Sequence, residues 1–432
     1  MLIKYDPLSS RLFDFKLTSD NQAILITAKA LLEDLLLITG KKDHVKLDFM
    51  VTMLINLHIS WLTTDMISIS RKPAVYAAIP TRYRLETESY GISKSITDAL
   101  YNNEFIDFYR GQKYDNQPGV LSKIHPTSQL TDLIKKCELN LVYRKQPKEL
   151  IELRESNGHL KDYQDTTVTK RWRFDLVGYN KLIAENKISI FKVPEKTVKD
   201  NKVYFNTYTL LNTEAYRPGD LKDVVLKRMW LRRVFNFDFK HGGRLYGGIE
   251  TMPSVLRANI KINGQKTIEL DFKSYQVRML YHKLRIDYRD DAYSALCQDD
   301  PQMREVYKII ALITLNSANE RAGLQAIGKE LRKQNLTSKI GGTKDSVLKP
   351  LLENFKNVHQ RLSRYFYSGV GLELQAVDSE ITNNILKDFV ARGVLVLSVH
   401  DSFIAAGDLK YELLKTMKAE YSKVFKYEPE IA

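Results

Sequence analysis

Two acidic residues, each at the end of an apolar segment, are the positions of this sequence best suited to chemistry. Asp271 follows Thr267–Leu270, and Asp401 follows Val394–Val399 with one histidine between. An unpaired carboxylate at the end of an apolar strand is unfavourable unless a cation or donor neutralises it. Two carboxylates on neighbouring strands can hold two divalent cations about 3.5–4 Å apart, which promotes in-line displacement at phosphorus. We therefore expect Asp271 and Asp401 to be metal ligands.

A cationic helix face is predicted between the two acids. Residues 304–316 have helical periodicity, with Arg304 and Lys308 one turn apart and Asn316 further along the same face. The opposite face is apolar. Like charges at this spacing repel slightly, so an anion held between them would explain the arrangement. The alternative is a solvated basic stripe on a core helix.

A glycine-rich segment places an arginine where a ligand or another chain can come close. Glycine pairs flank Arg-Leu-Tyr in the run Gly242–Gly248, and they permit close backbone approach. Arg244 is then placed to hold a phosphate or a base edge, although a purely structural hairpin has the same pattern. The sequence has no Walker-type loop and no Gly-x-Gly-x-x-Gly motif, so it lacks a standard nucleotide cradle.

Local periodicity also predicts the elements that position the two acids. After Asp271 the apolar period changes from two to about 3.6, so a strand should give way to a helix there. A later helix is expected from Leu372 to about Arg392, with Gly393 ending it. The strand that follows leads into the turn His400–Ser402, which would expose Asp401.

Composition favours a globular protein with a polyanionic partner. The 432 residues are enough for two or three domains, and 44% hydrophobic with 27% charged residues is typical of folded proteins. Lys and Arg (66) outnumber Asp and Glu (52), giving +14, which favours nucleic acid; a basic protein without such a partner is the alternative. Two cysteines cannot make a disulfide framework or a zinc cluster.

Neither the N-terminus nor the apolar segments predict export or membrane insertion. The first residues lack the layout of a signal peptide. The apolar stretches Ala23–Leu37 and Phe49–Leu62 are too short or too interrupted to span a bilayer. We expect a soluble, cytoplasmic monomer with no membrane partner, encoded by a phage, plasmid or other mobile element.

The N-terminal region has the layout of a winged helix-turn-helix domain. Helical periodicity at 22–38 and 45–62 is followed by a short helix at 89–100 and strands at 105–109 and 120–124. A small helical subdomain with a solvated face is the alternative. The expected DNA contacts are Lys94, Ser95, Arg110 and Lys113.

The middle of the chain is predicted to connect this head to a C-terminal unit. Residues 135–170 are polar and charge-mixed, as in a linker. Beyond them we expect strands at 172–176, 202–210 and 234–239, and helices at 179–185 and 221–232. The predicted domains are 1–135 (helical or winged-helix), 136–227 (connecting or thumb-like) and 228–432 (catalytic).

The motifs of the C-terminal unit together resemble a known superfamily. Asp271–Arg278 is similar to the first motif of family A DNA polymerases and phage-type single-subunit RNA polymerases, Asp-Phe/Tyr-Ser-x-x-Glu-x-Arg. Arg304 and Lys308 match the Arg-x-x-x-Lys of their fingers helix, and His400–Phe403 has the His-Asp-Ser-Phe form of the RNA enzymes. Gly243–Tyr246 resembles their Gly-Arg-Val/Leu-Tyr segment. The resemblance covers about residues 228–403.

The resemblance implies an α+β fold, with an antiparallel palm and reduced fingers, and roles for individual residues. Asp271 and Asp401 would hold two Mg²⁺ ions, with Mn²⁺ possible, while Arg304 and Lys308 would bind the triphosphate. Phe272, Gln276 and Asn316 would contact the nucleotide. Arg244, Gln375 and His400 would contact the nucleic acid.

Two positions depart from the family pattern and leave the sugar preference open. Gln276 stands where the DNA enzymes have Glu and the RNA enzymes a small residue, and Asn316 replaces a helix Tyr. The short interval from Asp271 to Arg304 implies reduced fingers, and no exonuclease motif is found before residue 230.

These features predict a nucleotidyltransferase that extends a 3′-hydroxyl on a DNA or RNA primer–template, using nucleoside triphosphates and two metal ions. One alternative is a plasmid or phage replication initiator, or another nucleic-acid-binding protein, with an inactive polymerase-like palm. A metal-dependent nuclease using the same carboxylates is the other. A nuclease has no need of the Arg304–Lys308 helix face.

Overall fold

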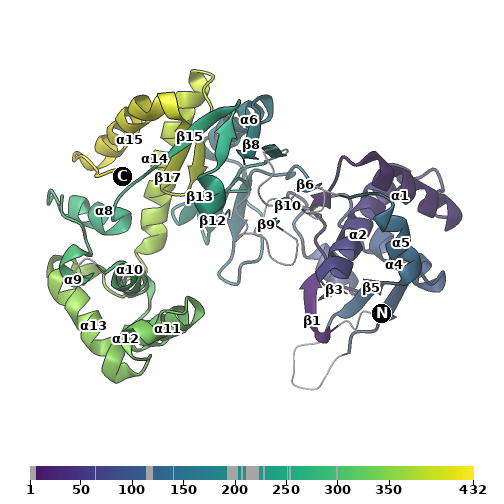
Figure 1. Cartoon of the computed structure of the whole chain (residues 1–432), viewed down its shortest axis with the longest axis horizontal. Helices are drawn as coiled ribbons and strands as arrows, with labels where there is room; N and C mark the ends of the chain where they lie inside the picture. Colours follow the sequence, from purple (N-terminus) through teal and green to yellow (C-terminus); the bar gives the residue numbers. More distant parts are fainter. Residues whose placement is uncertain are drawn as a thin grey trace.

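The computed structural model has a mixed α and β architecture with mostly antiparallel sheets, in agreement with the predicted α+β class. Two bodies are joined near the middle of the chain (Figure 1). The structure describes residues 6–63, 65–112, 120–139, 141–191, 203–205, 208–210, 223–226, 229–250, 252, 254–297 and 300–432.

The N-terminal unit packs helices against a small sheet with strand order β1-β3-β5-β4. Its core helix α2 is buried along most of its length, and α1 packs on it. By length and composition α2 could cross a membrane, but 72% of its most apolar window is buried inside this unit. The elements are β1 (Asp6–Leu12), α1 (Gln22–Asp34), α2 (Asp43–Thr63), β3 (Asp65–Ile69), α3 (Pro73–Ala77), α4 (Tyr90–Asn102), β4 (Ile106–Tyr109), β5 (Ser122–Pro126) and α5 (Ser128–Lys135).

A second small sheet, of order β2-β6-β10-β9, includes strands from both sides of the junction. Its strands are β2 (Leu17–Thr18), β6 (Leu141–Arg144), β9 (Val203–Phe205) and β10 (Tyr208–Leu210). β2 pairs with β6, and β6 with β10, both antiparallel.

Two sheets build the C-terminal unit. The larger has the order β11-β8-β14-β15-β17-β16, and the smaller has the order β13-β12-β7. Their strands are β7 (Ile151–Arg154), β8 (Ile188–Phe191), β11 (Asp223–Leu226), β12 (Arg232–Asn236), β13 (Gly242–Tyr246), β14 (Ile260–Ile262), β15 (Gln265–Asp271), β16 (Leu397–Val399) and β17 (Ser402–Ala406).

Helices surround these sheets, and α9 to α13 form an extension to one side (Figure 1). The long helix α14 contacts the sheet strand β13 and the helices α6, α8, α10 and α15, so it links the extension to the sheets. The helices are α6 (Thr167–Glu185), α7 (Ser254–Arg257), α8 (Tyr275–Lys283), α9 (Ser294–Cys297), α10 (Pro301–Asn316), α11 (Glu320–Lys333), α12 (Thr337–Ile340), α13 (Asp345–Val358), α14 (Gly371–Ala391) and α15 (Lys410–Phe425), with 3-10 turns at Gln360–Tyr365 and Gly407–Leu409.

Two hydrophobic cores divide the described chain close to β6. One core ends with Val142, and the other begins with Tyr143 and Leu150 and continues to Tyr421. β7, α6 and β8 contribute to the second core and pair or pack with later elements. The described part of 136–227, predicted as a connecting region, therefore packs largely with residues 228–432.

Two predicted elements in this range were wrong. Residues 172–176, expected as a strand, lie inside α6, which a capping box of Thr166 and Thr169 begins. Trp172 and Leu176 are buried one turn apart, so tertiary packing overrides the preference of Trp172 for strands. Within 221–232, expected as a helix, residues 223–226 form β11, which pairs with β8.

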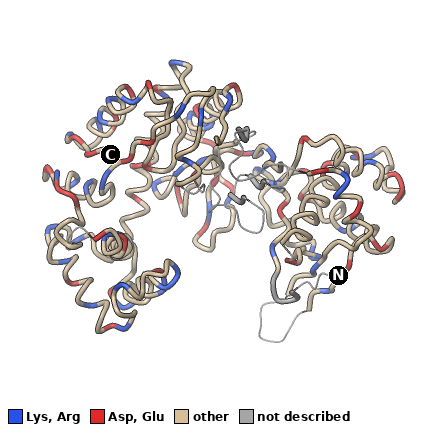
Figure 2. The backbone as a smooth tube through the Cα atoms, viewed as in Figure 1, with Lys and Arg blue, Asp and Glu red and all other residues tan. Residues whose placement is uncertain are grey.

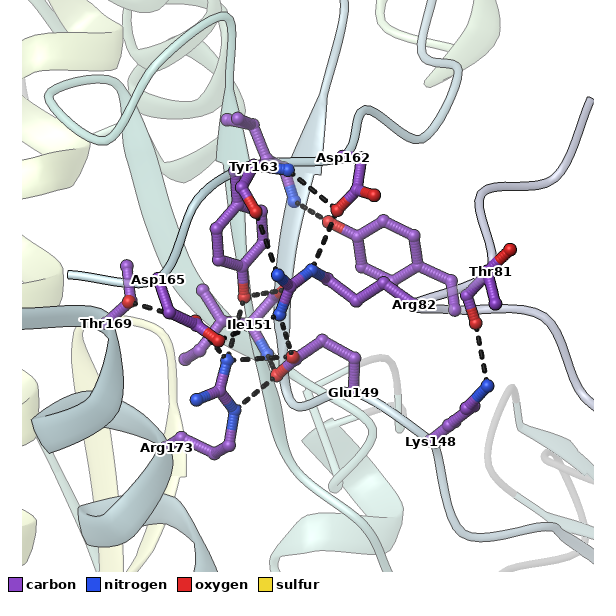
Figure 3. A network of polar contacts seen from close by, with 12 residues as sticks. Thr81, Arg82, Lys148, Glu149, Ile151, Asp162, Tyr163, Asp165, Thr169 and Arg173 are labelled. Carbon is purple, nitrogen blue, oxygen red and sulfur yellow. Dashed lines mark hydrogen bonds and ion pairs between the residues drawn. The ribbon is translucent and has the colours of Figure 1, made fainter.

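A cluster of ion pairs joins the two units (Figure 3). Arg82, from the loop between α3 and α4, donates to Asp162 at 2.9 Å, to Glu149 at 3.1 Å and to the carbonyl of Tyr163 at 2.8 Å. Glu149 also receives two bonds from Arg173 of α6, at 2.9 and 2.8 Å. We call these five residues the junction cluster. Because Glu149 is 6% exposed, its pairing with two arginines is needed to keep a charge there.

Candidate active site

The register of the large sheet brings the two predicted acids together. β15 pairs antiparallel with β17, and Asp271 lies directly opposite Ser402. Asp401, the residue before Ser402, accepts a backbone hydrogen bond from Phe272 at 3.4 Å. Directly opposed positions in an antiparallel pair have Cβ atoms about 4.5–5.5 Å apart. Asp401 is next to Ser402 in the chain, and Asp271 and Asp401 line one pocket at this end of the central strands, as expected from the sequence.

Local backbone geometry fixes both acids at this edge. Asp271 ends β15, and Ser274, with φ +52°, turns the chain into α8, as the change of period predicted. His400, with φ +58°, forms the turn between β16 and β17. Its carbonyl accepts a hydrogen bond from Thr382 of α14 at 3.3 Å, and its ring packs against Tyr246 with centroids 5.4 Å apart. His400 thus braces the turn that presents Asp401.

Ionisation is disfavoured at both carboxylates. Burial raises the pKa of Asp271 to about 7, and repulsion by Asp401 and Glu269 adds to this effect. Burial also raises the pKa of Asp401, against the opposing influence of Arg244. Asp271 is nevertheless exposed to solvent, and it lines a pocket. A divalent cation would relieve this repulsion.

An open pocket of about 570 Å³ lies over the acids. Asp271 and Asp401 line it together with Arg304 and Lys308 of α10. Further lining residues are Arg244, Phe272, Lys273, Ser274, Tyr275, Gln276, Val277, Asp291, Tyr293, Ala311, Leu312, Leu315 and Ala432. The pocket therefore combines acids on a sheet edge with cations and apolar side chains on a helix.

Both cations of α10 are paired with carboxylates of the protein. Arg304 makes a two-pronged bond to Asp291, each contact being 2.6 Å. Lys308 donates to Glu305 on its own helix at 2.7 Å, and both of these side chains are about half exposed. Lys308 also lowers the pKa of Asp271, although burial and Asp401 outweigh it. The predicted helical stripe thus faces the predicted acids.

A third acid, which sequence reasoning missed, lies beside the pair. Asp378 of α14 is 2% exposed and accepts a bond of 2.8 Å from Nε of Arg244. Burial raises the pKa of Asp378 to about 6, with Asp401 adding to this and Arg244 opposing it. A signal was available, because Asp378 shares helical spacing with the apolar residues Leu374 and Ile381 and so lies on the buried face of α14.

Several buried polar atoms beneath the pocket have no hydrogen-bond partner among the described residues. They are Oδ1 of Asp378, the hydroxyl of Tyr275 and Nδ1 of His400. Burial lowers the pKa of His400 to about 4, and Arg244 and Arg257 lower it further, so its ring is neutral at pH 7. A neutral, packed ring fits a bracing role better than proton transfer.

The other predicted nucleotide contacts lie in different places. Gln276 is partly exposed and lines the pocket. The ring of Phe272 is 2% exposed and stacks on Tyr275, so it serves the core and offers no face to a base. Asn316 bonds to the Leu312 carbonyl of its own helix. Among the described residues, Asn316 and Gln375 do not line the pocket.

The predicted DNA-contacting residues belong to the N-terminal unit. Lys94 and Ser95 are exposed on α4, and Arg110 is exposed just after β4. Lys113 lies outside the described residues. Figure 2 shows Lys and Arg interspersed with Asp and Glu along the backbone of both units, so the basic residues are not confined to one of them.

The oxygen donors that line the pocket suit a pair of hard cations. Asp271 and Asp401 supply carboxylate oxygens, the ligands that Mg²⁺ prefers. Among the described residues no group of three or more His, Cys, Asp or Glu residues is arranged to hold an ion. Mg²⁺ usually takes one or two carboxylates and completes its shell with water and substrate phosphate, so two acids are sufficient.

No protein-family model matches this chain, and no curated protein is significantly similar to it. The function is therefore argued from the pocket itself. The polymerase resemblance rests on the four short motifs quoted above.

Proposed function

We propose that this protein is a nucleotidyltransferase that adds nucleotides to a 3′-hydroxyl of a nucleic-acid primer. One observation carries the proposal: two carboxylates at the ends of adjacent strands and two cations on one helix line the same pocket. A nuclease needs only the carboxylates. The cationic wall supports a substrate that brings a polyphosphate chain with it.

Asp271 and Asp401 would hold the metal ions. Magnesium ions bound there, or manganese in their place, would activate the attacking oxygen and stabilise the leaving pyrophosphate. Arg304 and Lys308 would neutralise charge as it moves onto the phosphates. The apolar side chains of Ala311, Leu312 and Leu315 on the same wall suit the base or sugar.

Arg244 would position the primer end. It lines the pocket beside Asp401, and its bond to Asp378 holds the guanidinium in one orientation. A guanidinium held in this way can donate to a phosphate or a base edge with its remaining N–H groups. Asp378 is thereby a positioning residue.

The N-terminal unit would hold duplex DNA. The order α2, β3, α3, α4, β4, β5, with β5 between β3 and β4 in the sheet, is that expected of a winged helix. In such domains the last helix before the hairpin enters the major groove. Lys94 and Ser95 lie on that helix.

Primer extension tests the proposal directly. The full chain is incubated with a labelled primer–template, Mg²⁺ and either deoxy- or ribonucleoside triphosphates, and product length and sugar type are measured. We expect extension with at least one nucleotide set and none after EDTA. Nucleic-acid binding without incorporation in any metal or nucleotide set would reject the proposal in favour of a replication initiator with an inactive palm. Primer shortening would favour the nuclease.

A further inference from the structure

Arg304 is held by a carboxylate of the protein itself on the wall of the pocket. Its Nη1 and Nη2 donate to the two oxygens of Asp291, and the side chains are 31% and 29% exposed. A two-pronged, charge-assisted pair is among the strongest contacts that an arginine makes. Both residues line the pocket, and the Arg304 guanidinium also lies 5.2 Å from the centre of the Tyr293 ring.

Asp291 is fixed independently of Arg304. Its Oδ1 accepts from the backbone N–H groups of Tyr293 and Ser294 at 2.9 and 3.0 Å. The next residue, Ala292, is tied through its carbonyl to Nε2 of His359 at 2.9 Å. The carboxylate is thus held in place for pairing and loses little additional freedom when it pairs.

Two residues of the first motif anchor the same loop. The backbone N–H of Ala292 donates to Oγ of Ser274 at 3.2 Å. Arg278, 1% exposed on α8, donates to the carbonyl of Asp290 at 3.2 Å and to that of Tyr288. These contacts join the strand-to-helix segment that begins at Asp271 to the loop that carries Asp291. The sequence motif therefore positions the counter-ion of Arg304 as well as the metal ligand.

The second cation of α10 provides a comparison. Lys308 is paired with Glu305 by a single contact, and these side chains are 45% and 50% exposed. Exposed pairs contribute little, because water and salt screen them. A phosphate group must therefore outcompete Asp291 in order to bind Arg304, whereas Lys308 is easily released from Glu305.

We propose that Asp291 is an internal competitor of phosphate for Arg304, and that it sets the affinity of the pocket for polyphosphate. This inference rests on the proposed function, which makes α10 the polyphosphate-binding wall. A polyphosphate chain entering the pocket takes over the N–H groups that Asp291 occupies. Return of Arg304 to Asp291 then assists release of pyrophosphate after transfer. Arg304 in turn holds the pKa of Asp291 at about 2, so the competitor is ionised at every working pH.

The test compares Asp291→Asn with a matched control, Glu305→Gln. Asparagine keeps an oxygen that can accept from Tyr293 and Ser294, so the loop retains its backbone bonds while the charge is removed. Inorganic tripolyphosphate and pyrophosphate are titrated into the full chain by calorimetry in EDTA. We expect Asp291→Asn to bind tripolyphosphate more tightly by on the order of tenfold. Glu305→Gln should change affinity by less than about threefold.

A double variant isolates the pairing from the general effect of removing a negative charge. In an Arg304→Ala background, Asp291→Asn should change tripolyphosphate affinity very little, because the residue that it competes for is gone. An equal gain in that background would overturn the proposal, since charge removal alone would explain it. Weaker or unchanged binding by Asp291→Asn would also overturn it, and weaker binding would indicate that Asp291 orients Arg304 for phosphate.

The outcome is separable from that of the proposed function. Tighter tripolyphosphate binding by Asp291→Asn in a protein that never extends a primer would retain this inference and reject the polymerase. Primer extension by the wild type, together with unchanged tripolyphosphate binding by Asp291→Asn, would retain the polymerase and reject this inference. If the wild type and Arg304→Ala bind tripolyphosphate with equal affinity, Arg304 does not bind phosphate. That result would also reject this inference. In an active enzyme, Asp291→Asn should lower KM for nucleotide and strengthen inhibition by pyrophosphate.

Discussion

Asp271 and Ser402 are direct partners across β15 and β17, and this pairing sets Asp271 beside Asp401. The pairing of five successive residues, from Thr267 opposite Ala406 to Asp271 opposite Ser402, fixes the register. A one-residue slip would turn one acid to the other face of the sheet. The candidate site therefore depends on the strand register.

Replacement of either acid should remove activity and leave the fold intact. We expect Asp271→Asn and Asp401→Asn each to reduce nucleotide incorporation by at least about a hundredfold, the loss typical of removing a group that organises charge in the transition state. Single-nucleotide incorporation measures the effect, and circular dichroism checks the fold. Asp408→Asn, which removes an exposed acid outside the pocket, is the control. If the double variant Asp271→Asn/Asp401→Asn incorporates nucleotide at the wild-type rate, the proposed metal site is rejected.

Asp271→Asn should also stabilise the metal-free protein at alkaline pH. The pKa of Asp271 is raised from 3.8 to about 7, so the folded state holds this proton more tightly than the unfolded chain. Stability from this group is present below about pH 4 and is lost as pH rises to about 7. Because Asp271 opens to solvent, we expect a gain of only about 1 kcal/mol at pH 8.

Thermal unfolding in EDTA at pH 4 and pH 8 measures this difference. The variant and the wild type should unfold at similar temperatures at pH 4, and the variant should be the more stable at pH 8. Added Mg²⁺ should raise the unfolding temperature of the wild type more than that of the variant. Equal stability at both pH values would contradict the raised pKa.

The Arg244–Asp378 pair should show strong non-additivity. Arg244→Ala leaves a carboxylate that is 2% exposed without its cation, and we expect a loss of about 3 kcal/mol at pH 8. The loss should be smaller at pH 5, where Asp378, with its raised pKa, takes up a proton. Adding Asp378→Asn should recover part of the stability, because no buried charge then remains unpaired. Urea unfolding measures all three variants, and simple additivity would contradict the pairing.

The junction cluster should couple the two units. Arg82→Ala removes four hydrogen bonds between the loop before α4 and the segment 149–165, and we expect a loss of about 2 kcal/mol or a second thermal transition. Lys148→Ala is the control, because its Nζ makes one exposed bond to the carbonyl of Thr81 across the same junction (Figure 3). Calorimetry that shows equal small effects for both variants would exclude a coupling role for Arg82.

Lys94 should contribute to DNA binding through phosphate contact. Lys94→Ala should weaken duplex binding uniformly across sequences and reduce the salt slope by about 1. Lys29→Ala removes an exposed cation from α1 of the same unit and should leave binding unchanged. Fluorescence anisotropy over a range of salt concentrations makes the measurement. If the salt dependence of DNA binding has the same slope for the wild type and for Lys94→Ala, Lys94 on α4 does not contact a DNA phosphate.

Much of the framework around the site could be predicted because it depends on local rules. The strand-to-helix change after Asp271, the helix carrying Arg304 and Lys308, and the glycine that ends α14 follow from periodicity and capping between near neighbours. Only the second part of α6, residues 179–185, was predicted, and its first part was missed for the opposite reason. Trp172 favours strands by composition, and the burial of Trp172 and Leu176 against other elements decides the helix.

The sequence by itself determined which residue types end the strands and which cations share a helix face, because these depend on residues within a few positions of each other. Only the tertiary structure decided which side chains meet. Asp378 lies 134 positions from Arg244 in the chain, and the pairing of β15 with β17 joins segments equally distant. Such contacts depend on how sheets and helices pack, and short-range periodicity carries no information about the packing partner. The same holds for Asp291, whose role follows from the loop anchored by Ser274 and Arg278.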